Sequence, residues 1–119
     1  MQTNTILAII YWLLVAALVI PGYVFAIQKI FAQPQKLADF TRWGYSVTFM
    51  RLLGLAEAAA LSALLFTPTR TTGFIVYCII LAGAVYTHLK SRDDKKQLMT
   101  PVIVGAHTAV IFTLTFFVE

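Results

Sequence analysis

Residues 6–27 read ILAIIYWLLVAALVIPGYVFAI, a run of 22 residues without a charged side chain. A transmembrane α-helix needs about 20 consecutive apolar residues, because the hydrocarbon core of a bilayer is roughly 30 Å thick. The run is too long for the apolar part of a cleaved signal peptide, and no basic cluster precedes it. This stretch therefore predicts a membrane-spanning helix that stays in the mature protein.

Three more apolar segments follow the first, at residues 47–66, 73–89 and 101–118. Their lengths also suit spanning helices. We predict an all-α integral membrane protein, built as an antiparallel, left-handed, up-down-up-down four-helix bundle. Residues 1–119 would form one membrane domain, with helices at about 6–29, 45–66, 72–89 and 101–118.

The composition excludes several other classes of protein. Of the 119 residues, 60% are hydrophobic and 12% are charged, whereas soluble domains contain about 25% charged residues. The single cysteine, Cys78, excludes an internal disulfide and a Cys-x-x-Cys motif. A di-iron centre needs several carboxylates, and only Glu57 lies within a predicted span. We therefore predict no metal site.

Basic residues favour one side of the predicted membrane protein. With alternating spans, seven of them fall on one face and only Arg70 on the other. Cytoplasmic loops carry the excess of Lys and Arg, so we predict an inner (cytoplasmic) membrane protein with both termini outside. Loops 30–44 and 90–100 would be cytoplasmic. The first would contain a short amphipathic segment at 32–42, and the second would be a solvated loop at 91–100. Topology thus explains the basic residues, and nothing indicates a nucleic-acid partner. The seven are Lys29, Lys36, Arg42, Lys90, Arg92, Lys95 and Lys96.

Polar residues inside the predicted spans form the candidate site. Glu57 lies near the middle of its span, and Arg51 lies about 9 Å nearer the cytoplasmic face at ~1.5 Å per residue. A charge at mid-bilayer costs at least ~2.5–3.5 kcal/mol on insertion scales. His107 reaches a depth similar to that of Arg51, and His88 and Lys29 end their helices at the mouth. We predict a polar, ligand-binding funnel open to the cytoplasm.

Purely structural explanations exist for most of these residues. Lys29 is also explained as a side chain that snorkels to the interface, and His88 as a cap of its helix. Arg51 and Glu57 would also serve as a buried structural pair. His107 is harder to explain in this way, because it is polar within an otherwise apolar helix. No catalytic residue is assigned.

The chain resembles a known family through a combination of short motifs. The matching residues are Lys29-Ile30, Phe40-Thr41-Arg42-Trp43-Gly44-Tyr45, Arg51-Leu52-Leu53-Gly54-Leu55-Ala56-Glu57, His88 after Gly83-Ala84, and Pro101. Together they resemble the DoxX-like family of small four-helix membrane proteins. Two residues depart from the family pattern: Ala26 stands where Gly is usual, and Ser46 where Pro is common. Neither is among the predicted ligand-binding residues.

The resemblance implies a role near membrane redox chemistry. The family is named for a subunit associated with thiosulfate:quinone oxidoreductase, and other relatives resemble redox-enzyme partners or assembly factors. We predict that the funnel binds a quinone or a similar small amphipathic molecule, the only cofactor expected. Arg51 and His107 would hydrogen-bond the ligand oxygens. The expected partners are the lipid bilayer, a membrane redox protein and a second copy of the chain.

Two alternatives to the ligand-binding prediction stay open at this point. The chain would also fit a non-catalytic accessory or assembly factor, in which the polar residues only fix helix packing. It would also fit a small transporter. The pattern does not distinguish an enzyme from a binding protein.

Overall fold

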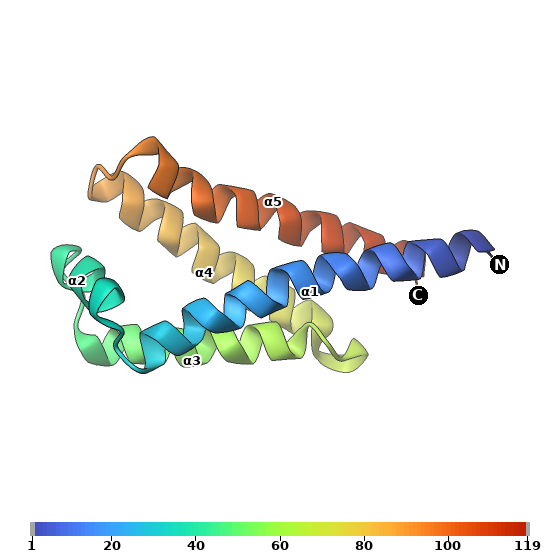
Figure 1. The fold of residues 1–119 in the computed structure, drawn as a ribbon, viewed down its shortest axis with the longest axis horizontal. Coiled ribbons are helices and arrows are strands. Elements are labelled where there is room, and N and C mark those ends of the chain that lie inside the picture. The colour runs from blue at the N-terminus through green and yellow to red at the C-terminus, as the bar shows by residue number, and fades with distance from the viewer. Residues whose placement is uncertain (1, 119) are drawn as a thin grey trace.

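The computed structural model describes residues 2–118, and these are helical almost throughout (Figure 1). The residues that it describes contain no strand, which confirms the all-α prediction. The elements are α1 (Gln2–Ile30), α2 (Pro34–Arg42), α3 (Val47–Ala63), the 3₁₀ helix η1 (Thr67–Thr69), α4 (Arg70–Lys90) and α5 (Lys95–Val118).

Three of these helices are long and apolar enough to cross a membrane. They are α1, α4 and α5, and a fourth span exists if α2 and α3, which meet at a bend of 115°, form one broken span. Large apolar side chains such as Leu13, Ile79 and Ile103 are exposed on the outside of the molecule. Such a surface suits contact with lipid rather than with water.

The long helices pack as two pairs that meet at one end. Helix α1 contacts α3 and α5, and α4 contacts the same two helices. The pairs α1–α3 and α4–α5 diverge toward the end occupied by α2, and the first residues of α1 and the last of α5 lie at the opposite end (Figure 1). The main apolar core, which includes Tyr11, Val15, Leu61, Phe74 and Ile111, joins α1, α3, α4 and α5.

Two glycines allow the helices to approach closely. A Cβ atom on Gly54 would lie 2.7 Å from the Ala26 carbonyl oxygen of α1, and one on Gly73 would lie 2.8 Å from the Ala60 carbonyl oxygen of α3. Small residues at helix interfaces allow this kind of backbone contact in membrane proteins. Gly54 therefore fixes the distance between α1 and α3.

The connections are more helical than the sequence predicted. Helix α2 occupies most of the predicted amphipathic segment 32–42. It begins at Pro34 because the Gln33 side chain accepts a hydrogen bond from the Lys36 N–H at 3.0 Å. Helix α5 begins at Lys95 rather than 101, because the Asp94 carboxylate accepts from the Gln97 N–H at 2.9 Å. The prediction of a solvated loop over 91–100 was therefore wrong for most of that segment.

Candidate functional site

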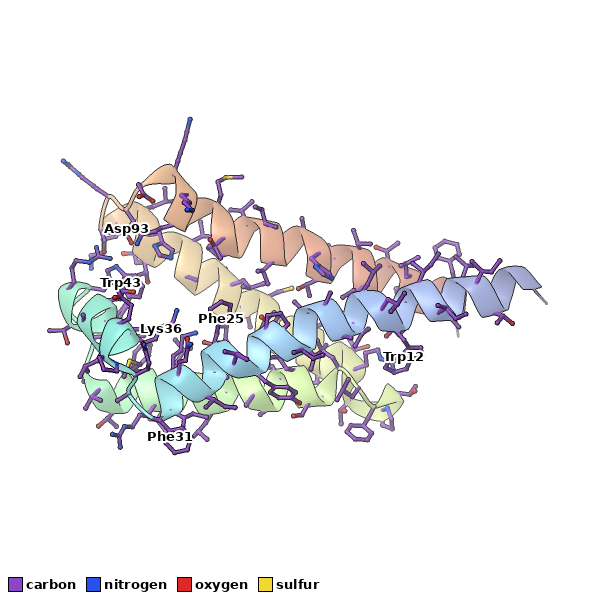
Figure 2. The ribbon with its side chains drawn as sticks, viewed as in Figure 1. Trp12, Phe25, Phe31, Lys36, Trp43 and Asp93 are labelled. Atoms are coloured by element: carbon purple, nitrogen blue, oxygen red, sulfur yellow. The ribbon has the colours of Figure 1, made fainter. Side chains whose placement is uncertain are left out.

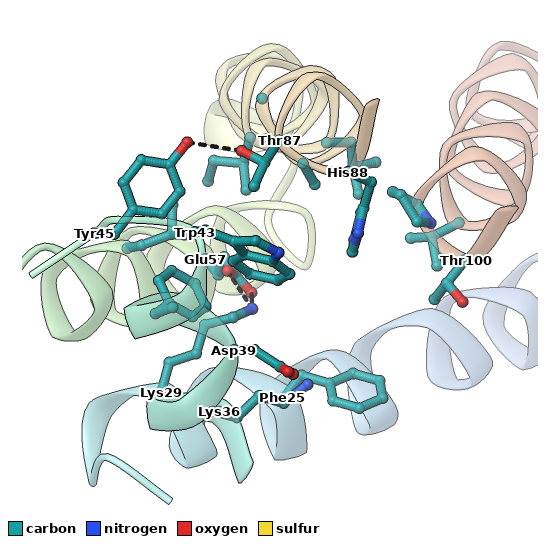
Figure 3. Close-up of a pocket in the computed structure, with 18 of the residues that line it drawn as sticks. Phe25, Lys29, Lys36, Asp39, Trp43, Tyr45, Glu57, Thr87, His88 and Thr100 are labelled. Atoms are coloured by element: carbon teal, nitrogen blue, oxygen red, sulfur yellow. Dashed lines mark hydrogen bonds and ion pairs between the residues drawn. The ribbon is translucent and has the colours of Figure 1, made fainter. Parts of the chain in front are cut away.

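A cavity of about 520 Å³ lies where the two helix pairs diverge (Figure 3). All five α-helices contribute to its wall. Ligand sites in proteins are typically concave, mostly apolar and supplied with a few polar groups, and this cavity has that character. Its apolar and aromatic lining includes Phe25, Phe40, Trp43, Tyr45, Phe49, Leu53, Tyr77, Ile80 and Val104.

An ion pair forms part of the cavity wall. Lys29 Nζ of α1 donates to both carboxylate oxygens of Glu57 on α3, at 2.6 and 2.9 Å (Figure 3). The two side chains are only 15% and 8% exposed. The contact depends on Gly54, where a Cβ would lie 3.0 Å from Lys29 Cβ. The pair satisfies a carboxylate that would otherwise be costly to bury.

A second lysine reaches the cavity from α2. Lys36 Nζ lies 4.7 Å from the centre of the Phe25 ring, and both residues line the cavity (Figures 2 and 3). A cation over an aromatic face is attracted by the electron-rich ring. Burial lowers the pKa of the Lys36 ammonium, and the neighbouring charge of Lys29 lowers it further.

Three side chains converge on Asp93 and tie α2 to the α4–α5 turn. Arg42 Nη1 and His88 Nδ1 each lie 2.6 Å from the Asp93 carboxylate, and Trp43 Nε1 donates to it at 3.1 Å (Figure 2). The Asp93 side chain is 2% exposed. The hydrogen bond from Arg42 is the main reason why the pKa of this carboxyl is lowered.

Aromatic packing and one more hydrogen bond hold α2 over the cavity. Phe40 is buried, with ring centres 5.1 Å from Trp43 and 5.9 Å from Tyr45. The Tyr45 and Thr87 hydroxyls are hydrogen-bonded at 2.8 Å (Figure 3). Together with the Asp93 contacts, these interactions join the segment between α1 and α3 to α4.

The structure brings together three of the five predicted ligand-binding residues. Lys29, Glu57 and His88 line the cavity, whereas Arg51 and His107 do not. Arg51 is exposed on the outside of α3, and Glu57 pairs with Lys29 instead. The ring of His107 is hydrogen-bonded through Nε2 to the Leu14 carbonyl oxygen at 2.9 Å, so it connects α5 to α1. The placement of Arg51 and His107 in one funnel with Glu57 was therefore wrong.

Sequence reasoning missed Lys36, Asp39 and Asp93. Lys36 and Asp39 line the cavity because α2 turns one face inward, whereas helical periodicity indicates an amphipathic helix without showing which face meets the other helices. Asp93 carried no such signal, since its partners Arg42 and Trp43 lie 51 and 50 residues away in the sequence. Within residues 2–118, no group of three His, Cys, Asp or Glu side chains is placed to hold a metal ion.

Comparison with known proteins gives one match over most of the chain. The model of the DoxX-like family matches residues 9–111. The chain belongs to the DoxX-like family. It is accordingly an integral membrane protein, as its apolar helices indicate. No match was found among curated proteins or among solved structures.

The two departures from the DoxX-like pattern have structural explanations. The Ser46 side chain caps α3 by accepting a hydrogen bond from the Phe49 N–H at 3.1 Å, which is a favourable role for serine. Ala26 is fully buried, and its carbonyl oxygen faces Gly54. The small residue that this contact needs is thus supplied by α3 rather than by α1.

Proposed function

We propose that this DoxX-like protein binds a small amphipathic molecule, a quinone or a similar carbonyl compound, in the cavity between its helix pairs. The observation that carries the proposal is the combination of an aromatic, largely apolar cavity with the Lys29–Glu57 ion pair in its wall. The ring and tail of the ligand would lie against Phe25, Phe49 and Ile80. Its polar head would lie near the ion pair.

The chemistry of the wall suits a carbonyl head. The Lys29 ammonium has three N–H donors, and the contacts with Glu57 leave donor capacity for a ligand oxygen. The Tyr45 and Thr87 hydroxyls, also in the wall, share one hydrogen bond, and the hydroxyl that accepts it keeps its own O–H for a ligand oxygen. The bound molecule would serve membrane redox chemistry, with a redox protein as partner. No side chain of this protein is assigned a catalytic role.

The same proposal includes a membrane topology. Helices α1, α3, α4 and α5 would each cross an inner membrane in alternating directions, and α2 would lie along the cytoplasmic surface. In support, six of the basic residues lie on α2, on the α4–α5 turn or next to it, at the end toward which the two helix pairs diverge. The end of the cavity that α2 covers would then face the cytoplasm. These residues are Lys36, Arg42, Lys90, Arg92, Lys95 and Lys96.

The test compares two matched variants on neighbouring positions of α4. Gly83 lines the cavity, and a Cβ there would meet no atom within 4 Å, so a side chain can be added at this position and Gly83→Phe should place a ring in the cavity. Ala82 is exposed and is not part of the lining, so Ala82→Phe is the control. Thermal unfolding in detergent is measured with decylubiquinone, menadione and their reduced forms.

The proposal predicts that at least one compound stabilises the wild type and Ala82→Phe but not Gly83→Phe. A ligand at about 100 times its dissociation constant adds roughly 2.7 kcal/mol to the free energy of unfolding, which a thermal shift resolves. If no compound stabilises the wild type, or if all three proteins respond alike, the accessory-protein alternative takes its place.

A further inference from the structure

The charged groups of the cavity wall divide into pairs with one residue left over. Glu57 pairs with Lys29 at 2.6 Å, and His88 pairs with Asp93 at 2.6 Å. Asp39, also in the wall, lies 3.8 Å from the Arg42 guanidinium. The remaining charged group in the wall is Lys36.

The Lys36 ammonium has no carboxylate within ion-pair distance among residues 2–118. Its nearest recorded contact is the Phe25 ring, 4.7 Å away, and a ring provides no full negative charge. Lys36 is partly buried and lies near the positive charge of Lys29, and the Asp39 and Glu57 carboxylates, beyond ion-pair distance, offset only part of these two costs. A cation in this position is stabilised by any anion that enters the cavity, because both desolvation and like-charge repulsion are then offset.

We infer that the cavity selects amphipathic molecules with a single negative charge on the head, held by the Lys36 ammonium. The inference rests on the proposed function and names the class of ligand more closely. One charge is favoured over two, because the wall has one unpaired cation and because the Asp39 carboxylate, three residues away on α2, repels a second negative charge. Acidic hydroxyquinones and amphipathic carboxylates belong to this class.

The aromatic neighbours fit a head with delocalised charge. Phe25 lies under Lys36, and the rings of Phe40 and Trp43 are also part of the wall. A flat, weakly hydrated anion loses less on leaving water than a compact one does, and it can stack on these rings. A hydroxynaphthoquinone anion has this form.

The experiment uses two probes that share a ring and an alkyl chain and differ in charge and by one methyl group. They are a 2-hydroxy-3-alkyl-1,4-naphthoquinone, whose acidic hydroxyl is ionised at neutral pH, and its 2-methoxy ether with the same alkyl chain. Dissociation constants are measured for the wild type, Lys36→Gln, Lys36→Arg and Lys95→Gln in one detergent. Lys95→Gln controls for the loss of an exposed positive charge outside the cavity wall.

We expect the wild type to bind the hydroxyl compound about tenfold more tightly than the ether, as one partly desolvated charge pair would give. Lys36→Gln should weaken binding of the hydroxyl compound by about that factor and leave the ether unchanged. Lys36→Arg and Lys95→Gln should keep the preference.

Each other result has a defined meaning. Equal binding of both probes to the wild type overturns the inference and leaves the proposed function standing. If Lys36→Gln weakens the binding of both probes equally, Lys36 has a structural role and the inference is also overturned. If neither probe nor any neutral quinone binds the wild type, the proposed function falls and the inference falls with it.

Discussion

At the scale of single residues, the Lys29–Glu57 pair is the buried ion pair that joins α1 to α3. Both side chains are mostly covered, and the two helices that carry them are in backbone contact at Gly54. Removing one member of a buried pair leaves an uncompensated charge, which typically costs about 3–5 kcal/mol. Replacing both members by uncharged residues of similar size costs much less.

Glu57→Gln and Lys29→Met should therefore each lower the free energy of unfolding by about 3 kcal/mol, and the double variant should recover part of that loss. Arg51 provides the matched comparison, because it is exposed on α3 and lies outside the cavity wall. Arg51→Gln combined with Glu57→Gln should give additive effects. Reversible unfolding in mixed detergent measures the free energy of unfolding for the single and double variants of both residue pairs. Coupling of Glu57 to Arg51 but not to Lys29 would contradict the Lys29–Glu57 ion pair.

Helical geometry explains why the sequence identified Glu57 but not its partner. At about 100° per residue, Arg51 and Glu57 each lie about 60° from Gly54, on opposite sides of it. Contact of Gly54 with α1 turns Glu57 toward the cavity and Arg51 outward. The position of α4 determines which of the two side chains faces the cavity, and no local sequence pattern encodes that position. His107 was misplaced for a similar reason, since its partner is a backbone carbonyl of α1.

At the scale of elements, α2 is the part of the fold that the sequence described least. The apolar runs predicted the long helices with errors of a few residues at their ends. The segment at 32–42 was predicted to be amphipathic, but not to close the cavity end, as its inner face does through Phe40, Lys36 and Asp39. The anchor for α2 is Asp93, which no pattern in the linear sequence connects with Trp43 or Arg42.

The Asp93 anchor should make the position of α2 sensitive to acid. The folded protein lowers the pKa of this carboxyl below its ordinary value of 3.8, so the carboxylate stabilises the folded state. That contribution is complete above pH 3.8 and is lost as the pH falls through the lowered pKa. In a Trp12→Phe background, Trp43 fluorescence should change at a midpoint below pH 3.8.

Asp93→Asn supplies the control for this titration. It removes the charge but keeps the size of the side chain, so α2 should already be loosened at neutral pH and the acid transition of Trp43 should vanish. An unchanged midpoint in Asp93→Asn would assign the transition to another carboxylate, such as Asp39 or Glu57, and would remove Asp93 as the anchor.

At the scale of the whole molecule, the proposed topology can be tested without a ligand. In a Cys78→Ala background, cysteines at Gln35 and Lys96 should resist a membrane-impermeant thiol reagent in intact cells, because both lie at the end assigned to the cytoplasm. A cysteine at Thr69, at the opposite end, should react. The reverse pattern would overturn the orientation, and labelling of all three would overturn the span count.

The central claim is that the cavity between the helix pairs holds a small amphipathic molecule. Native mass spectrometry of the gently solubilised protein tests it most directly, because the method reports the mass of whatever the protein retains. We predict one small adduct at a fixed ratio on the wild type and on Ala82→Phe, and its loss from Gly83→Phe, in which the new ring occupies the cavity. The same adduct at equal abundance on Gly83→Phe, or no adduct on the wild type, would contradict the claim.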